Sequence, residues 1–78
     1  MKTKLSDNVG NTPLNPITIG GYTVGGKAEV MNPSGSVKDR MATYIINHAE
    51  DNNLIKEGDT LIEATSGNTG VGLAMVCA

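Results

Sequence analysis

The chain has 78 residues, with six basic and eight acidic side chains and a formal net charge of −2 at pH 7. It carries no basic stripe, which excludes the electrostatic footprint of a nucleic-acid binder. A chain of this length forms at most one small domain that buries roughly 60% of its unfolded surface. Its single cysteine excludes an internal disulfide framework. With a polar N-terminus and no apolar run near the roughly 20 residues that span a bilayer, we expect a cytoplasmic protein.

The first third of the chain predicts extended structure. Residues 1–16 are polar and contain the closely spaced Pro13 and Pro16, which favour non-helical backbone. Two short β-branched segments follow at 17–19 and 22–24, on either side of a glycine pair, and predict a hairpin or two edge strands. Residues 27–31, KAEVM, predict one further short strand that ends at the following Asn-Pro.

From Ser36 onward the apolar residues recur at helical spacing and predict a helix of about four turns. Ser36 is the expected N-cap, and Asp39 is the expected acidic partner in a capping box. The sequence DNN at 51–53 is expected to end this helix. The residues that recur at this spacing and form the expected apolar side are Val37, Met41, Tyr44, Ile45, His48 and Ala49.

The last third predicts a strand, a loop and a second helix. Residues 60–64 read as a strand, 65–70 as a glycine-rich loop and 71–78 as the start of a helix. Together with the expected strand at 27–31, this order predicts a βαβ unit in an open α/β sheet with helices. The second helix reaches Ala78 without a capping glycine or a basic last turn, so we expect the chain to end inside an element.

The loop at 65–70 reads TSGNTG and lies where a strand is expected to meet a helix. Such a loop offers unpaired backbone N–H groups at the positive end of the helix dipole, which suits a carboxylate or a phosphate. Its hydroxyl and amide side chains add further donors. A plain polar turn with an N-cap explains the same composition, and the spacing matches neither the dinucleotide fingerprint nor a P-loop. Composition alone leaves the anion site and the plain turn open.

Lys38 stands at the expected first turn of the first helix, in the stretch NPSGSVKDR. A helix N-terminus disfavours added positive charge, and so favours a neutral amine that can attack a carbonyl and form a Schiff base. The alternative is an exposed lysine paired locally with Asp39. His48 is the single histidine and has no Cys or carboxylate cluster around it in the sequence, so no metal site is predicted.

The two stretches together closely resemble the cysteine synthase and cystathionine β-synthase family, whose members are fold-type II enzymes that use pyridoxal 5′-phosphate (PLP). PSGSVKDR at 33–40 precedes TSGNTG at 65–70 by one expected helix and strand, and three further segments agree in order. The resemblance implies that residues 1–78 form the incomplete N-terminal part of one α/β domain with the architecture of a tryptophan synthase β subunit. The agreeing segments are VGNTPL at 9–14, the pattern Lys27, Glu29, Asn32, Pro33, and EGDT at 57–60.

The resemblance also implies roles for individual residues. Lys38 corresponds to the lysine that forms the Schiff base with PLP and later moves the proton at the substrate Cα. Asn68 corresponds to the asparagine that donates to the 3′-oxygen of the cofactor ring. Asp39 and Arg40 are expected to be structural and to fix the start of the helix. The residues expected to bind the substrate, chiefly through its α-carboxylate, are Thr65, Ser66, Gly67, Asn68 and Thr69.

The implied activity is β-replacement in cysteine biosynthesis. In a cysteine synthase, O-acetyl-L-serine loses acetate to give an aminoacrylate, and sulfide then adds to give L-cysteine. The alternatives are a cystathionine β-synthase that uses serine and homocysteine, and a non-catalytic fragment or peptide-binding module. The family's phosphate cup lies beyond position 78, so this chain by itself is expected to be inactive. The implied partners are an amino-acid substrate, a second copy in a homodimer and the C-terminal tail of serine acetyltransferase.

Overall fold

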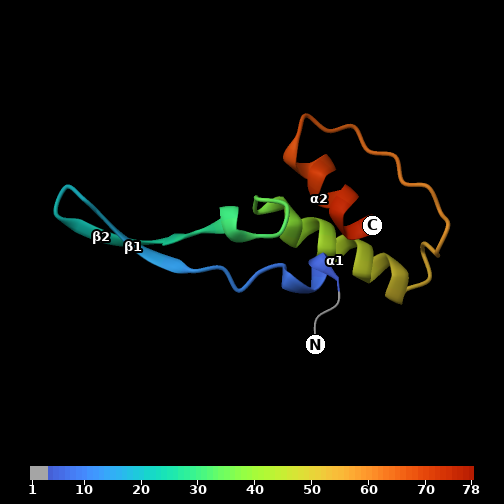
Figure 1. The fold of residues 1–78 in the computed structure, drawn as a ribbon, viewed down its shortest axis with the longest axis horizontal. Helices are drawn as coiled ribbons and strands as arrows, with labels where there is room; N and C mark the ends of the chain where they lie inside the picture. Colours follow the sequence, from blue (N-terminus) through green and yellow to red (C-terminus); the bar gives the residue numbers. More distant parts are fainter. Residues whose placement is uncertain (1–3) are drawn as a thin grey trace.

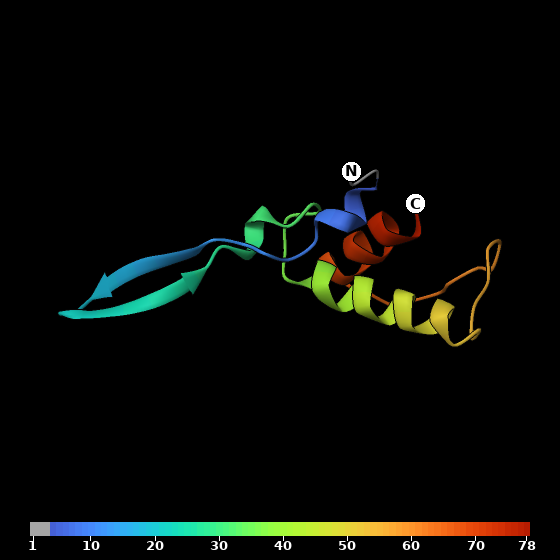
Figure 2. The same ribbon diagram turned by 90° about the horizontal axis from the view of Figure 1, so that it is seen from below.

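The computed structural model describes residues 4–78, which form two distinct regions (Figure 1). A hairpin of β1 (Leu14–Ile19) and β2 (Tyr22–Lys27) projects at one end of the molecule. At the other end α1 (Lys38–Asp51) packs against α2 (Asn68–Cys77), and the 3-10 turn η1 (Leu5–Asn8) lies beside them (Figure 2). A second 3-10 turn, η2 (Glu29–Met31), links the two regions, and the molecule measures 52 × 33 × 19 Å.

The projecting hairpin confirms the prediction for residues 17–24. Its strands are antiparallel, with Ile17 opposite Val24 and Ile19 opposite Tyr22. The turn uses Gly20 and Gly21 at φ 56° and 82°. Positive φ at both positions is what the two-residue hairpin turn with the correct twist requires, and glycine adopts it without steric cost. The side chains of both strands are largely exposed.

The strand predicted at 27–31 is wrong. Lys27 is the last residue of β2, and Glu29–Met31 forms the single 3-10 turn η2. This turn is closed by the bonds from Met31 N to Ala28 O (3.0 Å) and from Asn32 N to Glu29 O (3.1 Å). The turn places Glu29 and Asn32 on the same side, where they bond to each other, and an extended strand would separate them.

The strand predicted at 60–64 does not form either. These residues run without regular secondary structure along the connection from α1 to α2 (Figure 1). Within residues 4–78 the hairpin is the one sheet, so no neighbouring strand offers a ladder to this segment. A parallel strand is held by the strand beside it, and its own sequence cannot replace that partner. The β-branched and apolar pattern alone is therefore insufficient here.

Helix α1 has the predicted length but a different start. It begins at Lys38, and the N-cap residue Val37 provides no side-chain cap. The predicted capping box is wrong, because the Asp39 carboxylate turns back to Ser34: it accepts from the Ser34 backbone N–H (2.7 Å) and from the Ser34 hydroxyl. The Ser36 hydroxyl does accept from the Lys38 N–H (3.2 Å), which satisfies one orphan donor of the first turn.

The end of α1 is set by local sequence, whereas the side of α1 that is buried is set by contact with α2. Asn53, in the left-handed region at φ 57°, ends the helix as predicted, with Leu54 N bonded to Ala49 O (2.8 Å). The buried residues are Asp39, Ala42 and Ile46. The expected apolar side of the helix is not the buried one, because Val37, Tyr44 and Ile45 are exposed. The position of α2, which the α1 sequence does not specify, selects the side that is covered.

Helix α2 starts at Asn68, earlier than the predicted Val71, and crosses the first turn of α1 closely. A Cβ atom at Gly72 would lie 3.2 Å from the Lys38 carbonyl oxygen and 3.3 Å from Asp39 Oδ1. Gly72 is accordingly the buried residue of this helix, and glycine permits the close approach of the two backbones. In the described part of the chain, no helix has the length and apolar character needed to cross a membrane.

Candidate functional site

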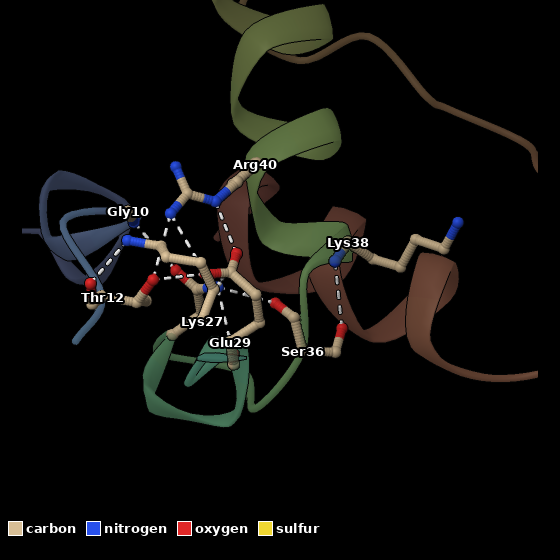
Figure 3. Close-up of polar contacts among 8 residues, drawn as sticks. Gly10, Thr12, Lys27, Glu29, Ser36, Lys38 and Arg40 are labelled. Carbon is tan, nitrogen blue, oxygen red and sulfur yellow. Dashed lines mark hydrogen bonds and ion pairs between the residues drawn. The ribbon is translucent and has the colours of Figure 1, made fainter. Parts of the chain in front are cut away.

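Residues from three distant segments meet beside the first turn of α1 in what we call the Glu29 cluster (Figure 3). The Glu29 carboxylate is its centre. It accepts from Arg40 Nε (2.5 Å) and Nη2 (3.1 Å), from the Thr12 hydroxyl and from Asn32 Nδ2 (3.1 Å). Lys27 Nζ donates to the Thr12 carbonyl oxygen (2.6 Å). The cluster consists of Gly10, Thr12, Lys27, Glu29, Asn32 and Arg40.

The charge state of Glu29 follows from these bonds. The hydrogen bonds donated by Arg40, and then the bond from the Thr12 hydroxyl, lower the pKa of Glu29 to about 2, and the Asn32 amide adds to this. The same Glu29 bond raises the pKa of Arg40 above its usual value. Donors that bind a carboxylate favour its charged form. Glu29 is therefore ionised at neutral pH, and Glu29 and Arg40 form a charge-assisted, bidentate pair.

Asn32 extends the cluster to the turn before α1. It is 4% exposed, and its Oδ1 accepts from the Gly10 N–H (2.8 Å). Its Nδ2 group donates to the Glu29 backbone oxygen (3.1 Å) and to the Ser36 backbone oxygen (3.1 Å). Gly10 is at φ 86°, and a Cβ atom there would lie 3.1 Å from Arg40 Nη1. The buried amide thus connects the N-terminal segment, η2 and the turn that precedes Lys38.

Lys38 itself lies outside the cluster. Its side chain is exposed and points away from Glu29 and Arg40 (Figure 3). The local pairing with Asp39 that the sequence left open does not form, because the Asp39 carboxylate is fully buried and bonded to Ser34. Among residues 4–78 the single ion pair is that of Arg40 with Glu29. The Lys38 amine is therefore available to a ligand.

The predicted anion loop begins with an unexpected cap. Thr65 Oγ1 accepts from the Gly67 N–H (3.2 Å) and from the Gly70 N–H (3.0 Å), so Thr65 caps α2 although Gly67 occupies the N-cap position. A Cβ atom at Gly70 would lie 2.5 Å from Thr65 Cγ2, which shows how closely the cap is packed. Because Oγ1 is the acceptor in both bonds, the Thr65 hydroxyl hydrogen is still available for donation.

The next two backbone donors remain open. Within the described residues, the N–H groups of Asn68 and Thr69 donate to no protein acceptor. The side chains of Ser66 and Asn68 are exposed. Two unpaired N–H groups at the first turn of a helix form the arrangement that binds a carboxylate or a phosphate. The structure thus places open donors in the loop that the sequence indicated.

The contact at Gly72 brings the two predicted site segments together. Gly72 touches the backbone of Lys38, and Asn68 lies one turn earlier in α2, about 6 Å along the axis at 1.5 Å per residue. A free amine and a set of open N–H and amide donors therefore lie on neighbouring helix starts. These residues fit the aldehyde and the ring oxygen of PLP, and a carboxylate beside them. Lys38 and Asn68 are both exposed, so the site lies at the surface of the molecule.

The structure also shows what the sequence reasoning missed. The segments around Thr12, Glu29 and Asn32 contributed to the resemblance, but nothing indicated that their side chains meet Arg40. The available signal was the dense set of polar residues in KAEVMNP, which disagrees with the strand predicted there. A strand with that composition places buried polar groups without partners, whereas the observed turn satisfies them.

Comparison with known proteins decides the family. Residues 5–78 match the model of the family described as pyridoxal-phosphate dependent enzyme. The chain belongs to this family. Cysteine synthase 1 of Neurospora crassa is 49% identical over 77 residues, which cover 94% of this chain and 20% of that protein. Cysteine synthase B of Campylobacter jejuni is 48% identical over 75 residues, covering 96% and 25%.

Two solved structures share the fold of this family member. A hydrogen sulfide-producing enzyme of Fusobacterium nucleatum matches with a TM-score of 0.89 and 46% identity, over 99% of this chain and 26% of that one. An O-acetylserine dependent cystathionine beta-synthase of Helicobacter pylori matches with a TM-score of 0.86 and 38% identity, over 97% and 27%. The chain thus spans between 20% and 27% of the length of these four proteins. The predicted fold class, the PLP dependence of the family and the resemblance are confirmed.

Proposed function

We propose that residues 4–78 supply the Schiff-base lysine and the carboxylate-binding loop of a PLP-dependent β-replacement enzyme of the cysteine synthase type. The observation that carries this proposal is the unpaired Lys38 amine beside a helix whose Asn68 and Thr69 N–H groups are open. The relatives named cysteine synthase support the choice of reaction. The similarity to the O-acetylserine dependent cystathionine beta-synthase of Helicobacter pylori supports O-acetylserine as the amino-acid substrate.

Each residue then has a defined task. Bound PLP supplies an electron sink for the negative charge that develops at the substrate Cα. Lys38 would hold the cofactor through its amine, and the same amine would accept the proton from the substrate Cα. The Asn68 amide donates to the ring oxygen, and the hydroxyls of Thr65, Ser66 and Thr69 donate to the substrate carboxylate. Because the Gly67 N–H is already bonded to Thr65, the open Asn68 and Thr69 N–H groups complete the carboxylate site.

The overall reaction balances without an oxidant or a reductant. The bond from Cβ of O-acetyl-L-serine to the acetate oxygen breaks, and acetate leaves with the electron pair. Sulfide forms the new bond at Cβ, and the proton that Lys38 took from Cα returns there. The products are L-cysteine and acetate. Donors fixed before the substrate arrives cost no reorganisation when the carboxylate binds.

Carboxylate binding can be tested on the chain directly by NMR. We expect O-acetyl-L-serine to shift the amide resonances of Asn68 and Thr69, because these N–H groups receive the carboxylate. The matched control is O-acetyl-L-serine amide, which keeps the rest of the molecule and lacks the carboxylate. Equal shifts with both compounds, or no shift with either, contradict the carboxylate site.

The Schiff base can be tested by reduction with borohydride after incubation with PLP. We expect the pyridoxyl group on the peptide that contains Lys38, and no such group on the corresponding peptide of Lys38→Ala. Equal labelling of every lysine contradicts the assignment. Turnover is a separate question, since the chain spans only 20% to 27% of the length of the proteins it matches. From this chain by itself we expect binding without turnover.

Cystathionine synthesis is the second candidate, because one matching structure carries that name. In a turnover assay of a complete enzyme containing these residues, cysteine formed from O-acetylserine and sulfide supports the first choice. Cystathionine formed from homocysteine, without cysteine synthesis, supports the second. The open N–H groups also suit a peptide's C-terminal carboxylate, so binding of a serine acetyltransferase tail is part of the proposal. A homodimer and a cytoplasmic location are proposed from the family resemblance alone.

A further inference from the structure

Three consecutive residues at the start of α1 point to three different sides. Successive side chains on a helix are separated by about 100°. Arg40 reaches the Glu29 cluster and Lys38 extends away from it (Figure 3). The Asp39 carboxylate bonds to Ser34 and lies beside Gly72 of α2. The directions of Arg40 and Asp39 therefore determine where Lys38 can lie.

The contact made by Arg40 resists rotation of this first turn. Its Nε and Nη2 atoms bind both oxygens of Glu29, and Nη2 also donates to Thr12 Oγ1 (3.2 Å). Two parallel bonds from a planar guanidinium fix an orientation as well as a distance. A single bond would let the helix turn about the contact. The carboxylate is in turn held by Asn32, which is 4% exposed.

The backbone of the first turn of α1 is held by the bonds from Asp39 N to Ser36 O (3.4 Å) and from Arg40 N to Val37 O (3.1 Å), neither of which fixes the direction of the Lys38 side chain. Val37 gives no side-chain cap, and the Lys38 N–H is held by one bond to the Ser36 hydroxyl. Initial turns lack partners for their first N–H groups and fray readily. Lys38 is the first helical residue, so fraying displaces its amine first.

We propose that Arg40, held by Glu29, is a positioning residue that sets the direction of the Lys38 amine and so its reactivity toward an aldehyde. The proposal rests on the assignment of Lys38 as the Schiff-base lysine. It adds that the Glu29 cluster, which touches no reacting atom, determines how fast that lysine reacts. The low pKa of Glu29, about 2, keeps the pair charged throughout the neutral range.

The probe is PLP with cyanoborohydride, applied to the whole chain. Lys38 Nζ forms a C=N bond with the aldehyde carbon as water leaves, and cyanoborohydride delivers hydride to that carbon. The labelling ratio of Lys38 to the exposed Lys56 is read by peptide mass spectrometry, and the same chain in urea gives the ratio without positioning. We expect Arg40→Met and Glu29→Gln to lower the folded-state ratio about threefold or more toward the urea value.

The controls separate positioning from loss of fold. Glu50→Gln makes the same chemical change on an exposed part of α1 and is expected to keep the wild-type ratio. Arg40→Lys keeps the charge without the bidentate geometry, so an intermediate ratio is expected. If Arg40→Met loses its helical circular dichroism, Glu29→Gln decides, because its amide oxygen still accepts from Arg40. The urea midpoint of each variant shows the urea concentrations below which that variant is folded, and the folded-state ratio is measured there.

The outcomes are distinct. An unchanged ratio in folded Glu29→Gln and Arg40→Lys overturns the positioning role and leaves the Lys38 assignment intact. A wild-type ratio equal to the urea value overturns both, because Lys38 is then no more reactive than an unpositioned lysine. A lowered ratio in both variants with Glu50→Gln unchanged supports the proposal.

Discussion

The helical end of the molecule and the projecting hairpin are built in opposite ways. Around the start of α1, buried or half-buried polar groups are paired by contacts that join residues far apart in the sequence, such as Gly10 with Asn32 and Thr12 with Arg40. The hairpin is held by its own ladder, a two-glycine turn and an exposed contact between Thr18 and Thr23. Its apolar residues stay exposed, including Ile19 at 68% and Tyr22 at 78%.

This difference shows where the specificity of the fold resides. A hairpin needs only a turn and alternating β-branched residues, and both are local properties. The helix starts need distant partners, because a buried carboxylate or amide without its bonds is costly. Substitutions at the helical end should therefore disturb the site, whereas those in the hairpin should stay local. Four predictions test this comparison.

The largest expected effect is that of Asp39→Ala. Asp39 is fully buried, and its removal leaves the Ser34 N–H and hydroxyl without their acceptor. Losing a buried acceptor that satisfies two donors costs about 3 kcal/mol, a large part of the stability of a domain this small. Urea unfolding followed by circular dichroism measures the loss. Asp51→Ala, at the exposed last position of α1, is the matched control. An equal loss of stability in that variant would contradict the claim that the buried contact of Asp39 with Ser34 is the cause.

The second prediction concerns the cap of α2. Gly70→Ala places a Cβ atom 2.5 Å from Thr65 Cγ2 and displaces the hydroxyl that caps the helix. We expect a loss of about 1–2 kcal/mol in the free energy of unfolding. In a Thr65→Ser background the clashing methyl group is absent and the oxygen remains, so the same substitution should cost little. Equal costs in the two backgrounds would contradict the packing argument.

The third prediction is a loss of stability in acid that depends on Glu29. Its pKa is lowered in the folded state to about 2 from an ordinary value of 4.5. A carboxyl group whose pKa is lower in the folded than in the unfolded state stabilises the fold when the pH is above its unfolded-state pKa. For Glu29 this contribution is lost as the pH falls from about 4.5 to about 2. Urea midpoints between pH 7 and pH 2 should fall less steeply in Glu29→Gln than in wild type. Glu50→Gln should retain the wild-type slope; if it flattens the slope as much, the assignment to Glu29 is wrong.

The smallest expected effect is in the hairpin. Thr23→Val removes the exposed hydroxyl contact with Thr18 (3.1 Å) but keeps a β-branched side chain. We expect a change of a few tenths of a kcal/mol, about the value of one cross-strand pair. NMR hydrogen exchange should register it within β1 and β2 and leave the amide of Arg40 unaffected. A change in protection at Arg40 would show that the hairpin is coupled to the site.

The sequence predicted the elements whose signals are local. The glycine pair and the alternating residues indicated the hairpin, and the helical spacing with DNN at its end indicated α1. The strands predicted at 27–31 and 60–64 did not form. A polar turn satisfied Glu29 in the first case, and residues 4–78 contain no neighbouring strand for the second. Both failures concern partners that periodicity does not encode.

The sequence by itself determined the family, the amine at Lys38 and the donor-rich loop at 65–69, since these depend on residue type and order along the chain. Only the tertiary structure decided that Asp39 turns to Ser34, that Thr65 caps α2 and that Arg40 is held by Glu29. The reason is physical. A side chain's chemistry is fixed by its residue type, but its hydrogen-bond partner is whichever group the fold brings within reach.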